Sequence, residues 1–197
     1  LPEPSVPPRP AAAPGTLDAR LVGRVVDGEG RPAGDPRRQD DYVEDRFDLP
    51  PALLAAPPPN ELARAVAAHA YLGMLDVRPT EVDARWLFRA VKGGSGGRTI
   101  LHFGGTSRAR GGSAGPRMGD GASFQHEIVL DWTGYAFVEG GRIVELVAFA
   151  SGKERLTWDN PQVRAGGPAV AHLPAGRAID FEGLVRYGVL AAPLVQD

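Results

Sequence analysis

The chain has 197 residues, which is enough for one domain with its own hydrophobic core. A net charge of −2 gives no electrostatic support for nucleic-acid binding, and no apolar run reaches the roughly 20 residues that a membrane-spanning helix needs. Cysteine is absent, which excludes disulfides, thiolate metal sites and cysteine nucleophiles.

Residues 1–16 are rich in proline and alanine and predict an extended tether. Such a segment often follows a cleaved export signal or a lipid anchor, so we expect an exported protein. The bias of the chain towards Ala, Gly, Arg and Pro is typical of a GC-rich bacterial genome, so the expected location is the periplasm, the cell surface or the medium of a bacterium. Residues 17–197 are expected to form a single domain. Its first β-type run is ARLVGRVVD, at positions 19–27.

The segment from Asp35 to Leu49 is dense in charge. Its acids lack the alternating oxygen ligands and the central glycine of a regular calcium loop, and neighbouring arginines offset them. We therefore expect a solvated helix turn or an ion-paired loop here, rather than a metal site.

One main helix is predicted, from Asn60 to Leu75. Asn60 is a favourable N-cap, and the residues that follow are mostly strong helix formers. The apolar side of this helix is expected to pack on a sheet. His69 borders that side, and we expect it to be a hydrogen-bonded boundary residue.

Two β-type runs follow, Arg85 to Val91 and Arg98 to Phe103, and they predict an antiparallel pair. Residues 104–123 are then dominated by glycine and small polar residues. This segment is too poor in apolar side chains to form a core, so we expect a mobile loop. It has no phosphate-loop pattern, but a long loop of this kind can bind a partner.

Residues 124–158 are expected to form the centre of the sheet, because apolar residues alternate with polar ones from Phe124 to Trp132. Gly140-Gly141 supplies a tight turn between two further strands. The expected register pairs Val138 with Ile143, Phe137 with Val144 and Tyr135 with Leu146, and it places Glu145 on the face of Val138 and Ile143. Shorter strands are predicted at 153–158, 169–173 and 184–190.

Aromatic and polar side chains on these strands are the candidates for ligand binding: His126, Trp132, Tyr135 and Glu145. Each also has a structural interpretation, because aromatic residues on strands usually pack in a core and single carboxylates usually lie at a rim.

A metal site is the second chemical hypothesis. His102 and His126 lie on predicted strands on either side of the glycine-rich segment, and pairing of those strands would bring the two imidazoles together. Glu127 and Asp131 are expected on the opposite face, and no HxH or HExxH spacing is present. The sequence identifies no catalytic residue and no cofactor.

The segment WTGYAFVEGGRIVELVAFASGKERLTW, with the later HLPAG and VRYGVL, resembles uncharacterised exported proteins of planctomycete-type bacteria. These carry an apolar hairpin with a glycine turn near the C-terminus. The resemblance covers about a third of the chain. It implies an exported protein of unknown activity, and it transfers no catalytic residue.

Together these patterns predict an α+β fold, an antiparallel sheet or half-barrel with one main helix packed on it. The leading functional hypothesis is a non-enzymatic protein that binds a protein partner or small ligand through the sheet face or the glycine-rich loop. The alternatives are a metal-dependent or acid–base enzyme that uses His102 and His126, and a structural or assembly subunit of a larger complex.

Overall fold

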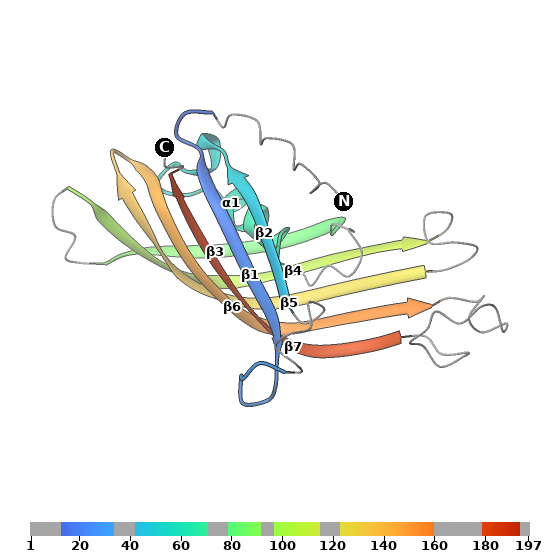
Figure 1. The fold of residues 1–197 in the computed structure, drawn as a ribbon. Helices are drawn as coiled ribbons and strands as arrows, with labels where there is room; N and C mark the ends of the chain where they lie inside the picture. The colour runs from blue at the N-terminus through green and yellow to red at the C-terminus, as the bar shows by residue number, and fades with distance from the viewer. Residues whose placement is uncertain are drawn as a thin grey trace, which may run out of the picture.

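The computed structural model describes residues 13–33, 42–70, 79–91, 97–114, 123–159 and 179–193. They form one seven-stranded sheet with a single short helix packed on it (Figure 1). The strands are β1 (Leu17–Val26), β2 (Tyr42–Leu49), β3 (Glu81–Val91), β4 (Thr99–Ala114), β5 (Ser123–Glu139), β6 (Arg142–Asp159) and β7 (Ile179–Pro193). A 3-10 turn, η2 (Pro51–Leu53), precedes the helix α1 (Asn60–Ala67).

The strand order across the sheet is β2-β1-β7-β6-β5-β4-β3, and every neighbouring pair is antiparallel. The predicted fold class is therefore confirmed. Strands β3 to β7 follow one another as a meander, and β1 (blue) lies beside β7 (red) although the two are far apart in sequence (Figure 1). The helices in the described segments are too short to cross a bilayer.

The sheet curves round α1, and this defines a core face toward the helix and an outer face away from it (Figure 1). Leu62, Ala63, Val66 and Ala67 of the helix are buried, because they lie on one side of it. His69 follows the helix and stacks on Phe47 of β2 at 3.8 Å between ring centroids. Its Nδ1 lies 2.7 Å from Asp45 Oδ2, so it is hydrogen-bonded, as expected.

The core face carries the alternate residues of each long strand. Phe103, Ile128, Leu130, Trp132, Leu146 and Val189 are among those buried there. Trp86 stacks on Phe103 and tilts against Trp132, with ring centroids 4.5 and 5.4 Å away. The buried Trp86 indole nitrogen has no hydrogen-bond partner among the described residues. The alternation predicted from Phe124 to Trp132 is thus, over the described side chains at 126–132, the pattern that fills this core.

The β5–β6 hairpin turns at Gly140 and Gly141, whose φ angles of 55° and 76° are those that glycine adopts at low cost. Val138 pairs with Ile143, as predicted, but a bulge follows between Phe137 and Val138. Val144 is the extra residue, so Phe137 pairs with Glu145, and Tyr135 pairs with Val147. The bulge moves Glu145 to the outer face, away from Val138 and Ile143.

The glycine-rich segment differs from its prediction as a mobile loop over 104–123. Residues 104–114 belong to β4, and 115–122 lie outside the described residues. The glycines have a packing role, because a Cβ on Gly105 would lie 1.9 Å from the carbonyl oxygen of Arg85. Arg108 and Arg110 pair with Glu127 on the neighbouring strand.

Three further expectations change. Residues 42–49 form a strand rather than a helix turn or loop, and Arg46 Nη2 pairs with Asp18 Oδ2 across to β1 at 2.6 Å. Helix α1 ends at Ala67, and residues 71–78 of the longer predicted helix lie outside the described residues. The strand predicted at 184–190 is part of β7, whereas 169–173 lies outside the described residues.

Candidate functional site

The candidate ligand residues of the sequence lie on two faces of the sheet. His126 and Trp132 are buried on the core face. Tyr135 lies on the outer face, where its ring makes an edge contact with His102 at 5.3 Å between centroids. Glu145 is also on the outer face, with its Oε2 3.6 Å from Arg98 Nη1. These four residues therefore do not line one site.

The two histidines of the metal hypothesis are not brought together. His102 pairs with Tyr135, nine positions along β5 from His126, which corresponds to about 30 Å. They also lie on opposite faces. His102 Nε2 is 3.2 Å from Thr133 Oγ1. No group of three or more His, Asp or Glu side chains that could hold a metal ion occurs within the described ranges.

His126 instead belongs to a buried polar cluster with Glu154 and Tyr187. Its Nε2 lies 2.5 Å from Glu154 Oε1, and the Tyr187 hydroxyl donates to Glu154 Oε2 at 3.1 Å. The exposed fractions of His126, Glu154 and Tyr187 are 4%, 1% and 3%. Burial, and then the charge and hydrogen bond of Glu154, raise the pKa of Tyr187 well above its ordinary value. The cluster is internally matched, which is the usual requirement for polar groups in a core.

A hollow of about 540 Å³ lies beside this cluster at the ends of β4, β5 and β6, and Arg110, Glu127 and Arg155 are among the residues that line it. Hydrogen bonds from Arg108 and Arg110 lower the pKa of Glu127, so that carboxylate stays ionised and paired. Arg108 and Arg110 thus neutralise the carboxylate at this hollow.

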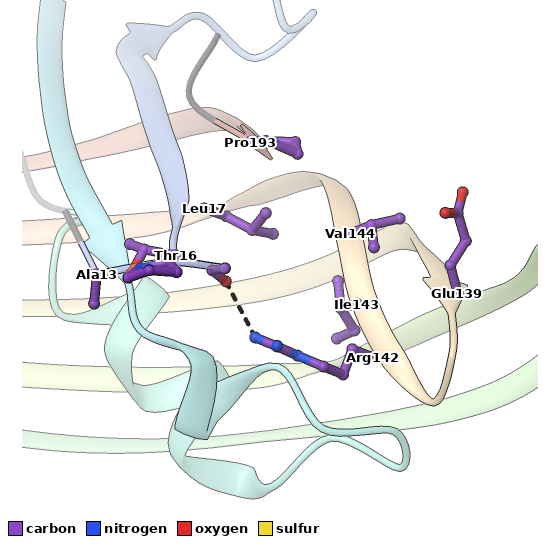
Figure 2. Close-up of a pocket in the computed structure, with 10 residues that line it drawn as sticks. Ala13, Thr16, Leu17, Glu139, Arg142, Ile143, Val144 and Pro193 are labelled. Atoms are coloured by element: carbon purple, nitrogen blue, oxygen red, sulfur yellow. Dashed lines mark hydrogen bonds between the residues drawn. The ribbon is translucent and has the colours of Figure 1, made fainter. Parts of the chain in front are cut away.

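A second hollow of about 280 Å³ lies between the start of β1 and the β5–β6 hairpin. Figure 2 shows the Arg142 side chain extending into it, with its Nη2 donating to the Gly15 carbonyl oxygen at 3.2 Å, while Glu139 points away. The hairpin backbone also bonds to the segment before α1, because Ile143 N donates to the Leu54 carbonyl oxygen. Arg142 thus partly fills this hollow, and the contacts around it connect the hairpin to the start of β1 and to the segment before α1.

The groove that best suits a ligand lies on the outer face, below the turn that ends β1, and has a volume of about 700 Å³. The turn residues Val26 to Gly30 form one side of it. The sheet side is formed by β5, β6 and β7: Val129, Asp131, Ser151, Gly152, Lys153, Leu184, Val185 and Arg186. We call it the β1-turn groove.

The turn over the groove is fixed by Asp27. Its Oδ1 accepts hydrogen bonds from the backbone N–H groups of Glu29 and Arg31, each at 2.9 Å, and its Oδ2 accepts from Arg31 Nε at 3.0 Å. The hydrogen bonds from Arg31 and the turn backbone lower the pKa of Asp27. The carboxylate therefore remains ionised at neutral pH and holds the turn in place.

Arg186 connects the turn to the sheet. Its Nη1 donates to the Gly30 carbonyl oxygen at 3.0 Å. Gly30 has a φ of 79°, and a Cβ at this position would lie 2.1 Å from Arg186 Nη2. Glycine is thus required twice, for the backbone conformation and for the guanidinium that lies against it.

Arg186 sits directly opposite Arg24 of β1 in the antiparallel register. Like charges in this position repel, and among the described residues neither guanidinium has a carboxylate partner. Arg24 Nε is buried and makes no hydrogen bond in the described part of the chain. Two other outer-face arginines are matched: Arg20 with Glu44 at 2.8 Å and Arg46 with Asp18 at 2.6 Å. The Arg24–Arg186 pair therefore places two positive charges in directly opposite positions, without a carboxylate partner among the described residues.

The outer face also carries an apolar ladder, which consists of Tyr135, Val147, Phe149 and Leu190. Tyr135 pairs with Val147, and Val147 with Leu190. Tyr135, Phe149 and Leu190 are 47%, 58% and 52% exposed, so the ladder is open to solvent.

Comparison with protein-family models, with curated proteins and with solved structures found no match to this chain. The resemblance to exported planctomycete-type proteins therefore stays a prediction. Sequence reasoning also missed Arg24 and Arg186, because each looks like an ordinary outward-facing residue until β1 and β7 are known to pair.

Proposed function

We propose that this protein is a non-enzymatic binding protein that takes a small anionic ligand in the β1-turn groove. The observation that carries the proposal is the Arg24–Arg186 pair, two arginines directly opposite each other in the register without a described carboxylate partner. A carboxylate or phosphate bound at Arg186, beside Arg24, supplies the missing negative charge. Both anions match the planar fork of arginine donors.

The energetics favour occupation by an anion. A buried donor without an acceptor, such as Arg24 Nε, costs about 1–3 kcal/mol. An anion bound at Arg186, which lines the groove, would relieve the repulsion between that side chain and the neighbouring Arg24. Ser151 pairs with Arg186 in the register, so its hydroxyl lies on the same row and is a further donor to the ligand.

The remaining charges of the groove limit where the anion binds. Lys153 Nζ lies 3.6 Å from Glu182 Oε1, and Arg31 is paired with Asp27 and Glu29. Asp131 pairs with Ser151 and so lies two strands from Arg186. It repels an anion at its own end of the row, which confines the ligand to the end that Arg186 lines, where Arg24 lies on the neighbouring strand.

The test is isothermal titration calorimetry of the whole chain with phosphate, sulfate and acetate at low salt. We expect binding that weakens as sodium chloride is added and falls at least tenfold in the Arg24→Gln/Arg186→Gln double variant. Arg85→Gln is the matched control. Arg85 lies at the other end of the same cross-strand row, and its loss should leave affinity unchanged. Equal losses in both variants, or no binding by the wild type, would refute the proposal.

The apolar ladder supports a second candidate, an assembly subunit that pairs with another copy through the outer face. Exposed contiguous apolar patches on proteins commonly mark interaction sites. Size-exclusion chromatography with light scattering, over a hundredfold range of concentration, tests it. A dimer that Phe149→Ser dissociates supports this candidate, and a monomer at every concentration removes it.

A further inference from the structure

The β1-turn groove has an apolar wall beside its cationic end, and from this we infer that the ligand is an amphiphilic anion with a single alkyl chain. The inference rests on the proposed anion-binding function and narrows it to one class of ligand. The head group, a carboxylate or a phosphate, would bind at Arg186, beside Arg24 on the neighbouring strand, and the chain would lie along the wall.

The apolar wall is one cross-strand row of the sheet. Val129 pairs with Lys153, Lys153 with Leu184, and Leu184 with Val26 of β1. Val129 and Leu184 are 46% and 38% exposed, although both line the groove. Solvent thus reaches apolar side chains that a bound chain would cover.

Lys153 does not interrupt the row. Its ammonium pairs with Glu182, and its methylene stem can lie along the apolar surface, as is common for lysine. The head-group row and the apolar row are adjacent: Arg186 and Leu184 are two positions apart on β7, and side chains two positions apart share a face. A ligand therefore meets charge and apolar surface about 7 Å apart.

The register also sets the length of the chain. The row from Val129 to Val26 crosses three spacings between strands, about 14 Å, which fits an alkyl chain of about ten carbons. The turn formed by Asp27 to Gly30 lines the same groove and covers the chain at the β1 end. A small inorganic anion would leave this wall in contact with water.

The experiment is a chain-length series titrated into the whole chain: inorganic phosphate, then ethyl, butyl and octyl phosphate below their aggregation concentrations. We expect affinity to rise about two- to fourfold for each added methylene. Leu184→Ser should lower the affinity for octyl phosphate at least fivefold, and lower that for inorganic phosphate by a much smaller factor. Leu190→Ser is the matched control, since it makes the same change on the same face of β7 outside the groove, and it should alter neither.

The outcomes separate the two proposals. If all four phosphates bind equally, the amphiphile inference is overturned and anion binding stands. If octyl phosphate binds but Arg24→Gln/Arg186→Gln has no effect on it, the anion site is overturned. If the protein instead binds only vesicles of phosphatidylcholine with phosphatidylglycerol, and no soluble alkyl phosphate, a membrane surface replaces the single-chain ligand.

Discussion

Tyr187→Phe removes one hydroxyl from the buried cluster and nothing else. That hydroxyl donates to Glu154 at 3.1 Å, and both side chains are buried. Hydrogen bonds to charged groups contribute about 1.5–3 kcal/mol, so we expect the free energy of unfolding to fall by about 2 kcal/mol at pH 7. For a chain of this size, that corresponds to a Tm lower by about 4–8 °C.

The difference should depend on pH, because the pKa of Tyr187 is raised in the folded protein. A group with a raised folded pKa contributes stability that is complete below its unfolded pKa, about 10 for tyrosine, and is lost as pH rises toward the folded pKa. The wild type should therefore lose more stability than Tyr187→Phe above about pH 10. The gap between the two proteins should narrow there, since all other titrating groups are shared.

Urea unfolding followed by tryptophan fluorescence, at pH 7.5, 9.5 and 10.5, measures this gap. Tyr135→Phe is the matched control, because that tyrosine is largely exposed, and its change should stay within about 0.5 kcal/mol. A Tyr187→Phe variant as stable as the wild type at pH 7.5, or a gap that stays constant up to pH 10.5, would refute this account of the cluster.

Two other substitutions test local packing. Gly30→Ala introduces a methyl group where the Arg186 guanidinium lies and strains a positive φ, so phosphate binding should weaken several-fold without any change of charge. Gly28→Ala, where a Cβ meets nothing within 4 Å, should bind phosphate as the wild type does. Gly105→Ala would place a Cβ 1.9 Å from the Arg85 carbonyl oxygen. It should lower the free energy of unfolding, measured in urea, by about 1–3 kcal/mol. Its neighbour Gly104→Ala, whose nearest contact is at 3.6 Å, should cost less, and equal losses would contradict the packing argument.

The sequence predicts the sheet best where alternation is strong. The buried face of β5 can be predicted because a strand places every second residue on the same side. Here those residues are Ile128, Leu130 and Trp132. Residues 104–114 also form a strand, but they show no apolar alternation because many of them are glycine. Their strand is held by neighbours: Ser107 accepts a hydrogen bond from Trp132 Nε1, and Arg108 pairs with Glu127.

The proposed site was beyond sequence reasoning for a different reason. Gly30 and Arg186 are 156 positions apart, and no local pattern shows that β1 lies beside β7. His126 stands out in the sequence, but no sequence pattern identifies the side chain to which it hydrogen-bonds. Glu154 is one of 24 acidic residues, and only the β5–β6 register places it near that imidazole.

The place of β7 between β1 and β6 has a consequence for how the chain folds. The β1–β2 hairpin and the meander from β3 to β6 do not pair with each other directly. They are joined only through β7, which lies between them and is the last of the seven strands to be synthesised. Such long-range pairing makes closure of large loops the slow step, because chain entropy must be given up before the contacts form. During synthesis, two partial sheets with open edges must therefore wait for β7. The β1-turn groove, with the turn that ends β1 on one side and Arg186 of β7 on the other, comes into existence only at that final step.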